Sequence, residues 1–305
     1  MFTFAREQQV IDIDGVKIGG QPGEYPTVII PTIFYDGHNI VDVGSNDFDK
    51  KKAEELINLV ESHSDITKNP CMFQVVGVTP EIMPKALDFV ADHTDSPLII
   101  DSADLSARLV GLDHVTEAGY GHRVMYNAIN MLIGEDEIDA LTRSEIDGVV
   151  ILDFNLQDTS VESRMALLED GGEFMDRGML DIAKSCGFEK ILFDPGVQPI
   201  EQGAGASFRL MYSVKAKYGL PTGIGAHNIP SSWAWLKSQE KTVRKVCDMS
   251  SNAAGIILGA DSLFIGPIEN APYAFPTAAM IDMLCADSAL DFGIKHIEEH
   301  PYSLA

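Results

Sequence analysis

The sequence predicts a closed barrel of eight parallel strands surrounded by helices, the (β/α)8 or TIM barrel. Eight short runs rich in apolar and β-branched residues are each followed by a segment with helix-like periodicity. These runs are continuously apolar rather than alternating, which is typical of parallel strands that are buried on both faces. A chain of 305 residues also suits this fold. We therefore expect one barrel domain that covers residues 1–305.

The strands are predicted in chain order, after an N-terminal extension. In the extension, VIDIDGVKIGG contains two short β-like runs around Asp14-Gly15, which is a strong hairpin signal. We expect residues 1–26 to form this hairpin extension, with the hairpin closing the bottom of the barrel, away from the chemistry. The eight barrel strands are expected at residues 27–34, 72–77, 97–101, 123–129, 148–154, 190–194, 220–226 and 261–266.

Helix signals lie between the expected strands. Residues 49–64 place Ala53, Leu56, Ile57 and Val60 on one face of a helix. Thr79-Pro80-Glu81 has the pattern of a helix N-cap followed by a proline in the first turn. The run GAGAS at 203–207 has no third glycine and lies late in the chain, so we interpret it as the opening of a helix rather than a dinucleotide-binding loop.

Composition and charge exclude several classes of partner. The chain has 22 Lys and Arg against 46 Asp and Glu, and its net charge of -24 repels nucleic acid and anionic lipid. No apolar stretch approaches the ~20 residues of a spanning helix, so no membrane insertion is expected. The four cysteines are scattered, no HExxH pattern occurs, and the N-terminus has no signal-peptide pattern. We predict a reduced, cytoplasmic protein that binds no metal directly.

The predicted strand ends carry the candidate site, because the active site of this fold lies at the carboxyl ends of the strands. Taken singly, each polar residue there is equally well explained as a turn former or a helix cap. Together they indicate a site for a neutral, donor-rich heterocycle, such as a 2-amino-4-oxo pyrimidine ring, whose N–H and amino groups one carboxylate can accept. The residues are Asp101, Ser102, Asn127, Asn130, Asp153, Asn155, Asp194, His227, Asn228, Glu269 and Asn270.

Several sequence blocks resemble a known family over essentially the whole chain. They are GVKIGGQPGEYPTVIIPTIFYDGHNIV, PLIIDSAD, YNAIN, GAHNIPSSWAWL and FIGPIENAPYAFP. This set resembles the H subunit of tetrahydromethanopterin S-methyltransferase and its bacterial relatives, which are similar in fold to the pterin-binding barrels that include dihydropteroate synthase. The resemblance implies methyl transfer between N5 of a tetrahydropterin and the cobalt of a corrinoid. The block FDPGVQPIEQGAGAS favours tetrahydrofolate over tetrahydromethanopterin as the pterin.

The resemblance also implies roles for individual residues. The positions that hold the ring in pterin-binding barrels match Asp101, Asn127, Asp194 and Asn228. The resemblance implies that Asp153 and Asn155 line the pocket, so the expected pterin-binding set has these six residues. The catalytic candidates are Asn228 and Asp101. Asn228 is expected to contact N5 directly, and Asp101 is expected to act through water.

The resemblance further implies a partner protein and a homodimer. The corrinoid-binding pattern D-x-H-x-x-G is absent, since Asp36-Gly37-His38 continues as Asn39-Ile40-Val41. The corrinoid is therefore expected on a separate corrinoid-binding protein.

Two other classes of protein stay open from the residues alone. A metal-assisted barrel enzyme would hold Mg²⁺ through the carboxylates of Asp101, Asp153, Asp194 and Glu269. Such an enzyme would also need Lys or Arg in the neighbouring loops, where we expect only Arg209. The other class is a noncatalytic protein that docks a corrinoid protein.

Overall fold

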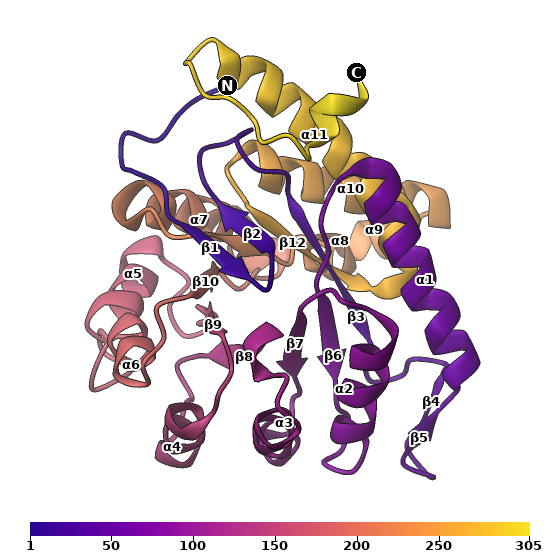
Figure 1. The fold of residues 1–305 in the computed structure, drawn as a ribbon. Coiled ribbons are helices and arrows are strands. Elements are labelled where there is room, and N and C mark those ends of the chain that lie inside the picture. The colour runs from indigo at the N-terminus through magenta and orange to yellow at the C-terminus, as the bar shows by residue number, and fades with distance from the viewer.

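The computed structural model describes all 305 residues and contains the predicted eight-stranded parallel barrel (Figure 1). The strands are hydrogen bonded in the order β10-β9-β8-β7-β6-β3-β12-β11. A parallel bridge between Phe193 of β10 and Thr222, the residue before β11, brings the first and last strands together, so the barrel is nearly closed. The strand bounds are β3 (Val28–Ile33), β6 (Phe73–Val76), β7 (Leu98–Asp101), β8 (Val124–Ile129), β9 (Gly148–Leu152), β10 (Ile191–Asp194), β11 (Gly223–Ile224) and β12 (Ser262–Pro267).

Each observed strand overlaps its predicted run, but β11 is much shorter than expected. It has two residues where residues 220–226 were predicted. Pro221 has no amide proton to give to a neighbouring strand, and this shortens the ladder at its start. The shorter strand leaves residues 225–227 in a loop, and this loop positions part of the site described below.

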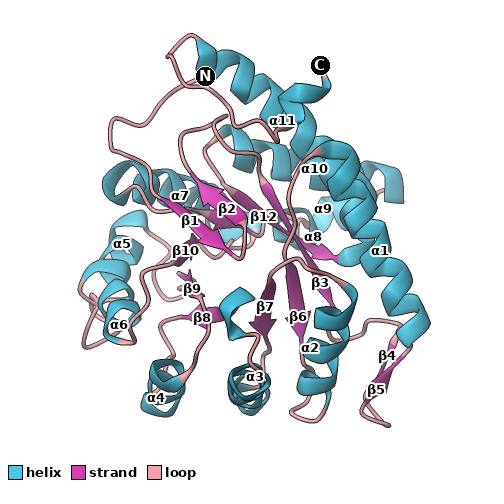
Figure 2. Ribbon diagram, viewed as in Figure 1, coloured by secondary structure: helices cyan, strands magenta, loops and turns pink.

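Helices surround the barrel, as the cyan ribbons of Figure 2 show. The first of them begins after Asp49, whose side chain accepts a hydrogen bond from the Lys52 amide at 3.2 Å. No helix in the chain is both long and apolar enough to cross a bilayer. The helices are α1 (Lys50–Thr67), α2 (Ile82–His93), α3 (Leu105–Ala118), α4 (Glu135–Arg143), α5 (Val161–Glu169), α6 (Met179–Ser185), α7 (Ala204–Tyr218), α8 (Asn228–Ser232), α9 (Ala234–Lys237), α10 (Lys241–Ile257) and α11 (Ala271–Leu290). A small antiparallel pair, β4 (Val41–Asp42) and β5 (Asp47–Phe48), lies between β3 and α1.

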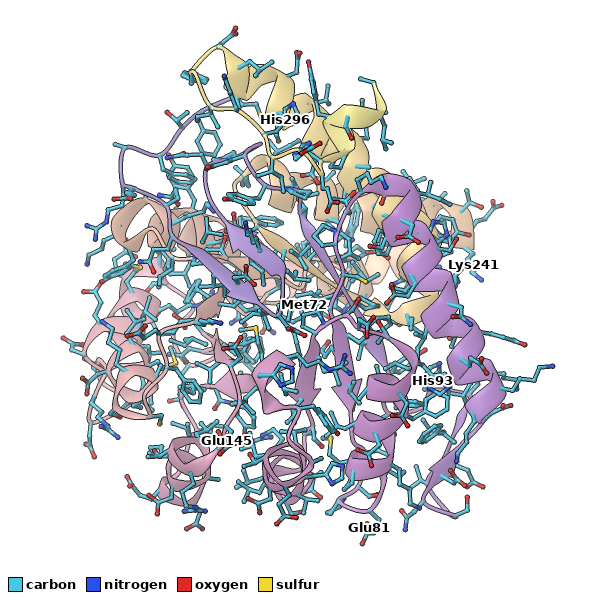
Figure 3. The ribbon with its side chains drawn as sticks, viewed as in Figure 1. Met72, Glu81, His93, Glu145, Lys241 and His296 are labelled. Atoms are coloured by element: carbon cyan, nitrogen blue, oxygen red, sulfur yellow. The ribbon has the colours of Figure 1, made fainter.

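The predicted hairpin is formed by β1 (Val10–Ile13) and β2 (Val16–Gly19). Asp14 and Gly15 both have positive φ, as a tight two-residue hairpin turn requires. Ile13 and Ile18 are fully buried in a cluster with residues from the amino-terminal halves of the barrel strands, including Val28. Met72, which lies near the centre of Figure 3, belongs to the same cluster. The hairpin therefore closes the barrel at the end opposite the carboxyl ends of the strands, as expected.

Candidate active site

The barrel brings the six predicted site residues to one end. Asp101 and Asp194 are the last residues of β7 and β10. Asn127 lies in β8 directly beside Asp101 in the strand register. Asp153 and Asn155 follow β9, and Asn228 is the first residue of α8 after β11. These side chains occupy the mouth formed by the carboxyl ends of the strands.

Asp101 is held by a chain of side-chain hydrogen bonds along three strands. Thr32 Oγ1 donates to Gln74 Oε1 at 2.6 Å, and Gln74 Nε2 donates to Asp101 Oδ2 at 2.7 Å. Burial raises the pKa of Asp101 to about 6, although the nearby charge of Arg108 and hydrogen bonding by Gln74 and Asn127 act in the opposite direction. A carboxyl group with this pKa can gain or lose a proton near neutral pH.

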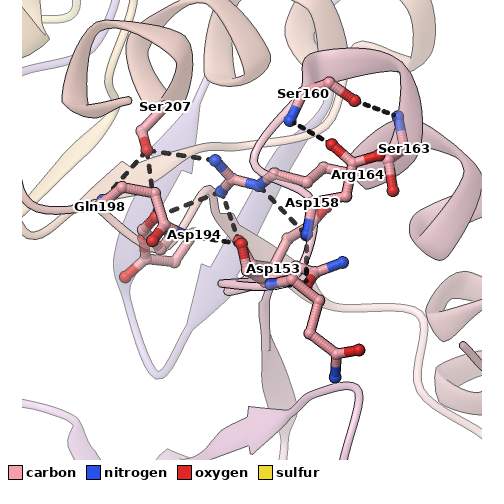
Figure 4. A network of polar contacts seen from close by, with 11 residues as sticks. Asp153, Asp158, Ser160, Ser163, Arg164, Asp194, Gln198 and Ser207 are labelled. Carbon is pink, nitrogen blue, oxygen red and sulfur yellow. Dashed lines mark hydrogen bonds and ion pairs between the residues drawn. The ribbon is translucent and has the colours of Figure 1, made fainter. Parts of the chain in front are cut away.

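A buried arginine organises the neighbouring part of the mouth (Figure 4). The Arg164 side chain is fully buried, and its Nε lies 3.4 Å from Asp153 Oδ1. Its other nitrogens donate to Ser207 Oγ at 3.2 Å, to the Gly196 carbonyl at 3.2 Å and to the Asp153 carbonyl. Ser207 lies in the first turns of α7, which begins within the predicted GAGAS segment. Arg164 thus fixes the ends of β9 and β10 against the start of α7.

The charge of the Arg164 guanidinium acts on two buried carboxyl groups, those of Asp153 and Asp194. Burial raises the pKa of Asp194 to about 7, and the Gly196 amide and the charge of Arg164 only partly offset the effect. Burial also raises the pKa of Asp153 to about 7, with Arg164 opposing and the charge of Asp194 reinforcing the rise. Asp194 Oδ1 accepts from the Gly196 amide at 2.8 Å. Both groups would be more stable as anions if a ligand offered them hydrogen-bond donors.

Three buried polar atoms in this region have no hydrogen-bond partner. They are Asp153 Oδ2, Asn155 Nδ2 and Gln198 Oε1, two acceptors and one donor. Leaving such a group unpaired costs about 1–3 kcal/mol. The three atoms are shielded from solvent, so a ligand reaches them only through a local rearrangement. Gln198 was not predicted, although it follows Asp194 by four residues in the same loop, and this position was the only sequence signal for it.

Asn228 is exposed and free to meet a ligand. Its amide side chain makes no hydrogen bond within the protein, and the residue that caps α8 is His227, which also makes no side-chain capping bond. The simple explanation that Asn228 caps this helix therefore has no support in the structure. His227 Nδ1 lies 2.7 Å from the Phe264 carbonyl oxygen, and its ring packs against Gly266, where a Cβ atom would come within 2.6 Å.

The expectation that basic side chains are scarce near the mouth is wrong. A hollow of about 460 Å³ lies beside residues 227, 230 and 231. Its lining includes four basic side chains, Lys237, Lys241, Arg244 and Lys245. The short helices α8 and α9 turn the chain so that the first turns of α10 lie beside the mouth, which periodicity alone did not reveal. Arg209, the one basic candidate from the sequence, lies on the exposed surface with its Nη2 atom 3.8 Å from Glu162.

The carboxylates proposed for a metal-assisted enzyme do not form a metal site. No group of three or more His, Cys, Asp or Glu side chains is arranged to hold a metal ion. Asp101 is bound to Gln74 and Asp153 to Arg164. Glu269 contacts His38 at 3.1 Å and Tyr35 at 3.3 Å. Three of the four proposed carboxylates are therefore already engaged by other side chains of the protein.

The comparison with solved structures shows the fold class of the protein. The fold matches dihydropteroate synthase of Yersinia pestis, solved with a pterine-sulfa conjugate, at a TM-score of 0.63. The match covers 92% of this chain and 100% of the other at 11% sequence identity, so it establishes the fold. The protein is a (β/α)8 barrel of the dihydropteroate synthase type.

Comparisons of sequence define the family within this class. The family model of the tetrahydromethanopterin S-methyltransferase MtrH subunit matches residues 6–297. The H subunit of tetrahydromethanopterin S-methyltransferase from Methanothermobacter marburgensis is 45% identical over 306 residues, which is 99% of each chain. The corresponding subunit of tetrahydromethanopterin S-methyltransferase from Methanocaldococcus jannaschii is 42% identical over 99% of each chain. The H subunit of the methyltransferase mtx from Methanosarcina barkeri, so named on a provisional basis, is 44% identical over 100% of this chain and 99% of its own. The chain belongs to the MtrH family and is a methyltransferase, which confirms the resemblance noted in its sequence blocks.

Proposed function

We propose that this methyltransferase moves a methyl group between N5 of a tetrahydropterin and a corrinoid carried by a partner protein. The observation that carries the proposal is the gathering of Asp101, Asn127, Asp194 and Asn228 at the barrel mouth, with the unpaired polar atoms of Asp153, Asn155 and Gln198 beside Asp194. A pterin ring offers an N–H and an amino group that the Asp194 carboxylate can accept together, and its carbonyl oxygen and further ring nitrogens are left for neighbouring polar groups. The names of the relatives support the same class of substrate.

The pyrimidine edge of the pterin is assigned to the ring-binding residues. Asp194, as a carboxylate, accepts from the ring N–H and the amino group in bidentate fashion, and Asn127 holds a neighbouring ring atom. Arg164 keeps Asp153 and the Asp194 loop in place before the ligand arrives. This fixed arrangement orients N5 toward the methyl acceptor or donor.

The difficult part of the reaction is the breaking of the bond between N5 and its methyl group. The electron pair stays on nitrogen, a poor leaving group unless a hydrogen bond or a proton is supplied as the bond breaks. The free amide of Asn228 would supply the hydrogen bond. Asp101, whose pKa burial raises to about 6, would supply a proton through water. No covalent bond to the protein is required.

Two observations bear on which pterin is used. The FDPGVQPIEQGAGAS block favours tetrahydrofolate, whereas the relatives are named for tetrahydromethanopterin. Both molecules carry the same pyrimidine edge, so the contacts of Asp194 and Asn127 apply to either of them. An assay that offers each pterin in turn decides between them.

The proposed partner is a separate corrinoid protein. His38 lies in the one stretch that begins like a corrinoid-binding pattern. Its ring is buried and both of its nitrogens have partners within the protein: Nδ1 accepts from the Phe34 amide at 3.2 Å, and Nε2 faces Glu269. A homodimer and a cytoplasmic location complete the proposal, and the four free cysteines, three of them buried, suit a reducing compartment.

Methyl transfer from methylcobalamin to a tetrahydropterin is expected to proceed without added metal and to be insensitive to EDTA. The reason is that the mouth offers hydrogen-bonding groups and no metal-ligand cluster. The measurement is the initial rate with and without the chelator. Complete loss of activity in EDTA, with recovery on adding Mg²⁺ or Zn²⁺, would instead support the metal-assisted class. A folded protein that binds corrinoid protein but never transfers a methyl group would support the docking class.

A further inference from the structure

A hollow beside the mouth concentrates positive charge in a strongly acidic chain. We call it the basic hollow and define it by Lys237, Lys241, Arg244 and Lys245. The last three stand at positions i, i+3 and i+4 of α10, so they share one face of that helix. Like charges at this spacing destabilise a helix, and a chain with 46 acidic and 22 basic residues has no general need to place them together. This cost in helix stability indicates a functional reason for the cluster.

Three of the four cations are free to bind an anion. Lys245 is already engaged, since its Nζ donates to Asn270 Oδ1, lies 3.7 Å from Asp248 and stands 4.9 Å above the Tyr273 ring. The side chains of Lys237, Lys241 and Arg244 are exposed and take part in none of the ion pairs of the protein. Asp248, the one acidic residue lining the hollow, is used by Lys245 and Asn252. The hollow therefore keeps an uncompensated positive charge.

The basic hollow adjoins the position at which the reacting atom of the pterin is proposed to lie. His227, Pro230 and Ser231 line it, and these residues flank Asn228 on both sides in the sequence. Ser251 Oγ donates to the Ala226 carbonyl at 3.0 Å and ties α10 to the loop after β11. Figure 3 labels Lys241, at the beginning of α10. A ligand whose ring occupies the mouth and whose tail leaves past Asn228 would enter this hollow.

We propose that the basic hollow binds the anionic tail of the reduced pterin through its carboxylate or phosphate oxygens. This inference rests on the proposed function. Tetrahydrofolate ends in a glutamate, and tetrahydromethanopterin carries a phosphate and further carboxylates, so both present oxyanions at a distance from the ring. A protein of net charge -24 repels such tails over most of its surface, and a local cluster of Lys and Arg reverses that repulsion where the substrate enters. The hollow has a volume of about 460 Å³, enough for part of a flexible tail, and it lies next to His227 and Pro230, on either side of Asn228.

The test compares a tailed pterin with a tailless pterin. Calorimetry measures the Kd of tetrahydrofolate and of 6-methyltetrahydropterin for the wild-type protein and for the double variant Lys241→Ala/Arg244→Ala. We expect the wild type to prefer tetrahydrofolate, and the double variant to lose about tenfold in affinity for it while its affinity for 6-methyltetrahydropterin stays unchanged. Added salt should reduce the wild-type preference, because exposed charges are screened. The control is Lys50→Ala/Lys184→Ala, which removes two exposed cations from other helices and should change neither Kd.

Other outcomes are equally decisive. Equal losses for both pterins, or no loss for either, would overturn the tail site. If neither Kd changes but the KM for the corrinoid protein rises, the hollow is a docking surface and the proposal is wrong. A wild-type protein that binds neither pterin would refute the proposed function itself. Within a positive result, tighter binding of tetrahydrofolate with added glutamates identifies carboxylates as the bound groups, whereas a larger loss for tetrahydromethanopterin identifies its phosphate.

Discussion

Replacing Asn228 with alanine is expected to slow methyl transfer by about 100-fold or more, the effect of removing one donor that stabilises charge in a transition state. The affinity for the pterin should change much less, because the contact with N5 strengthens as charge develops on that atom. Single-turnover rates and calorimetric Kd values on the same variant separate the two effects.

The structure supplies a control for this prediction. Asn130 is also an asparagine near the mouth, but its Oδ1 accepts from the Leu132 amide at 2.8 Å and so forms a local turn. Asn130→Ala should lower the melting temperature and keep the rate. If Asn228→Ala behaves in the same way, with reduced stability and an intact rate, its catalytic role is excluded.

Replacing Asp194 with asparagine is expected to abolish most of the pterin affinity, with a loss of about 1–3 kcal/mol for each ligand donor left without its acceptor. The asparagine keeps the shape of the side chain and can still accept from the Gly196 amide, so the Asp194 loop stays in place. Asn127→Ala should weaken binding in the same direction by removing one further partner. Unchanged affinity in both variants, with normal circular dichroism, would refute the assigned pocket.

The same Asp194→Asn variant should be more stable than the wild type in alkaline solution. Burial raises the pKa of Asp194 to about 7 in the folded protein, against roughly 4 in an unfolded chain. Below the lower value the carboxyl is protonated in both states; as the pH rises toward 7, the unfolded chain releases its proton first and the fold loses stability. Asparagine has no such loss, so its advantage in melting temperature should grow between about pH 4 and pH 7. A lower melting temperature at about pH 8 would show that Asp194 is a structural residue.

The fold could be predicted largely because its signals are local. The continuous apolar runs marked the barrel strands, and Asp14-Gly15 marked the hairpin that fills the amino-terminal end. The rule that active sites lie at the carboxyl ends of barrel strands then selected Asp101 and Asp194 from sequence position alone. The seventh strand was overestimated at both ends: Pro221 lacks an amide proton at its start, and the Gly225 and Ala226 carbonyls accept turn hydrogen bonds from the Asn228 and Ile229 amides at its end.

The supporting parts of the site depend on contacts between distant segments and could not be predicted. Arg164 lies on α5, and nothing in its neighbourhood in the sequence shows that it reaches Asp153 and the loop after β10. The basic hollow depends on the direction in which α8 and α9 turn the chain before Lys241. Gln198 became a candidate only when its oxygen was found buried without a partner.

The measurement that tests the central claim most directly is a single-turnover visible spectrum. The purified protein, in excess over cob(I)alamin, is mixed with N5-methylated tetrahydrofolate or N5-methylated tetrahydromethanopterin. We expect the cob(I)alamin absorbance to be replaced by that of methylcobalamin with at least one of the two pterins, and we expect Asn228→Ala to slow this change. A cob(I)alamin spectrum that persists with both methylated pterins, under conditions where the protein is folded and binds them, would contradict the proposed methyl transfer.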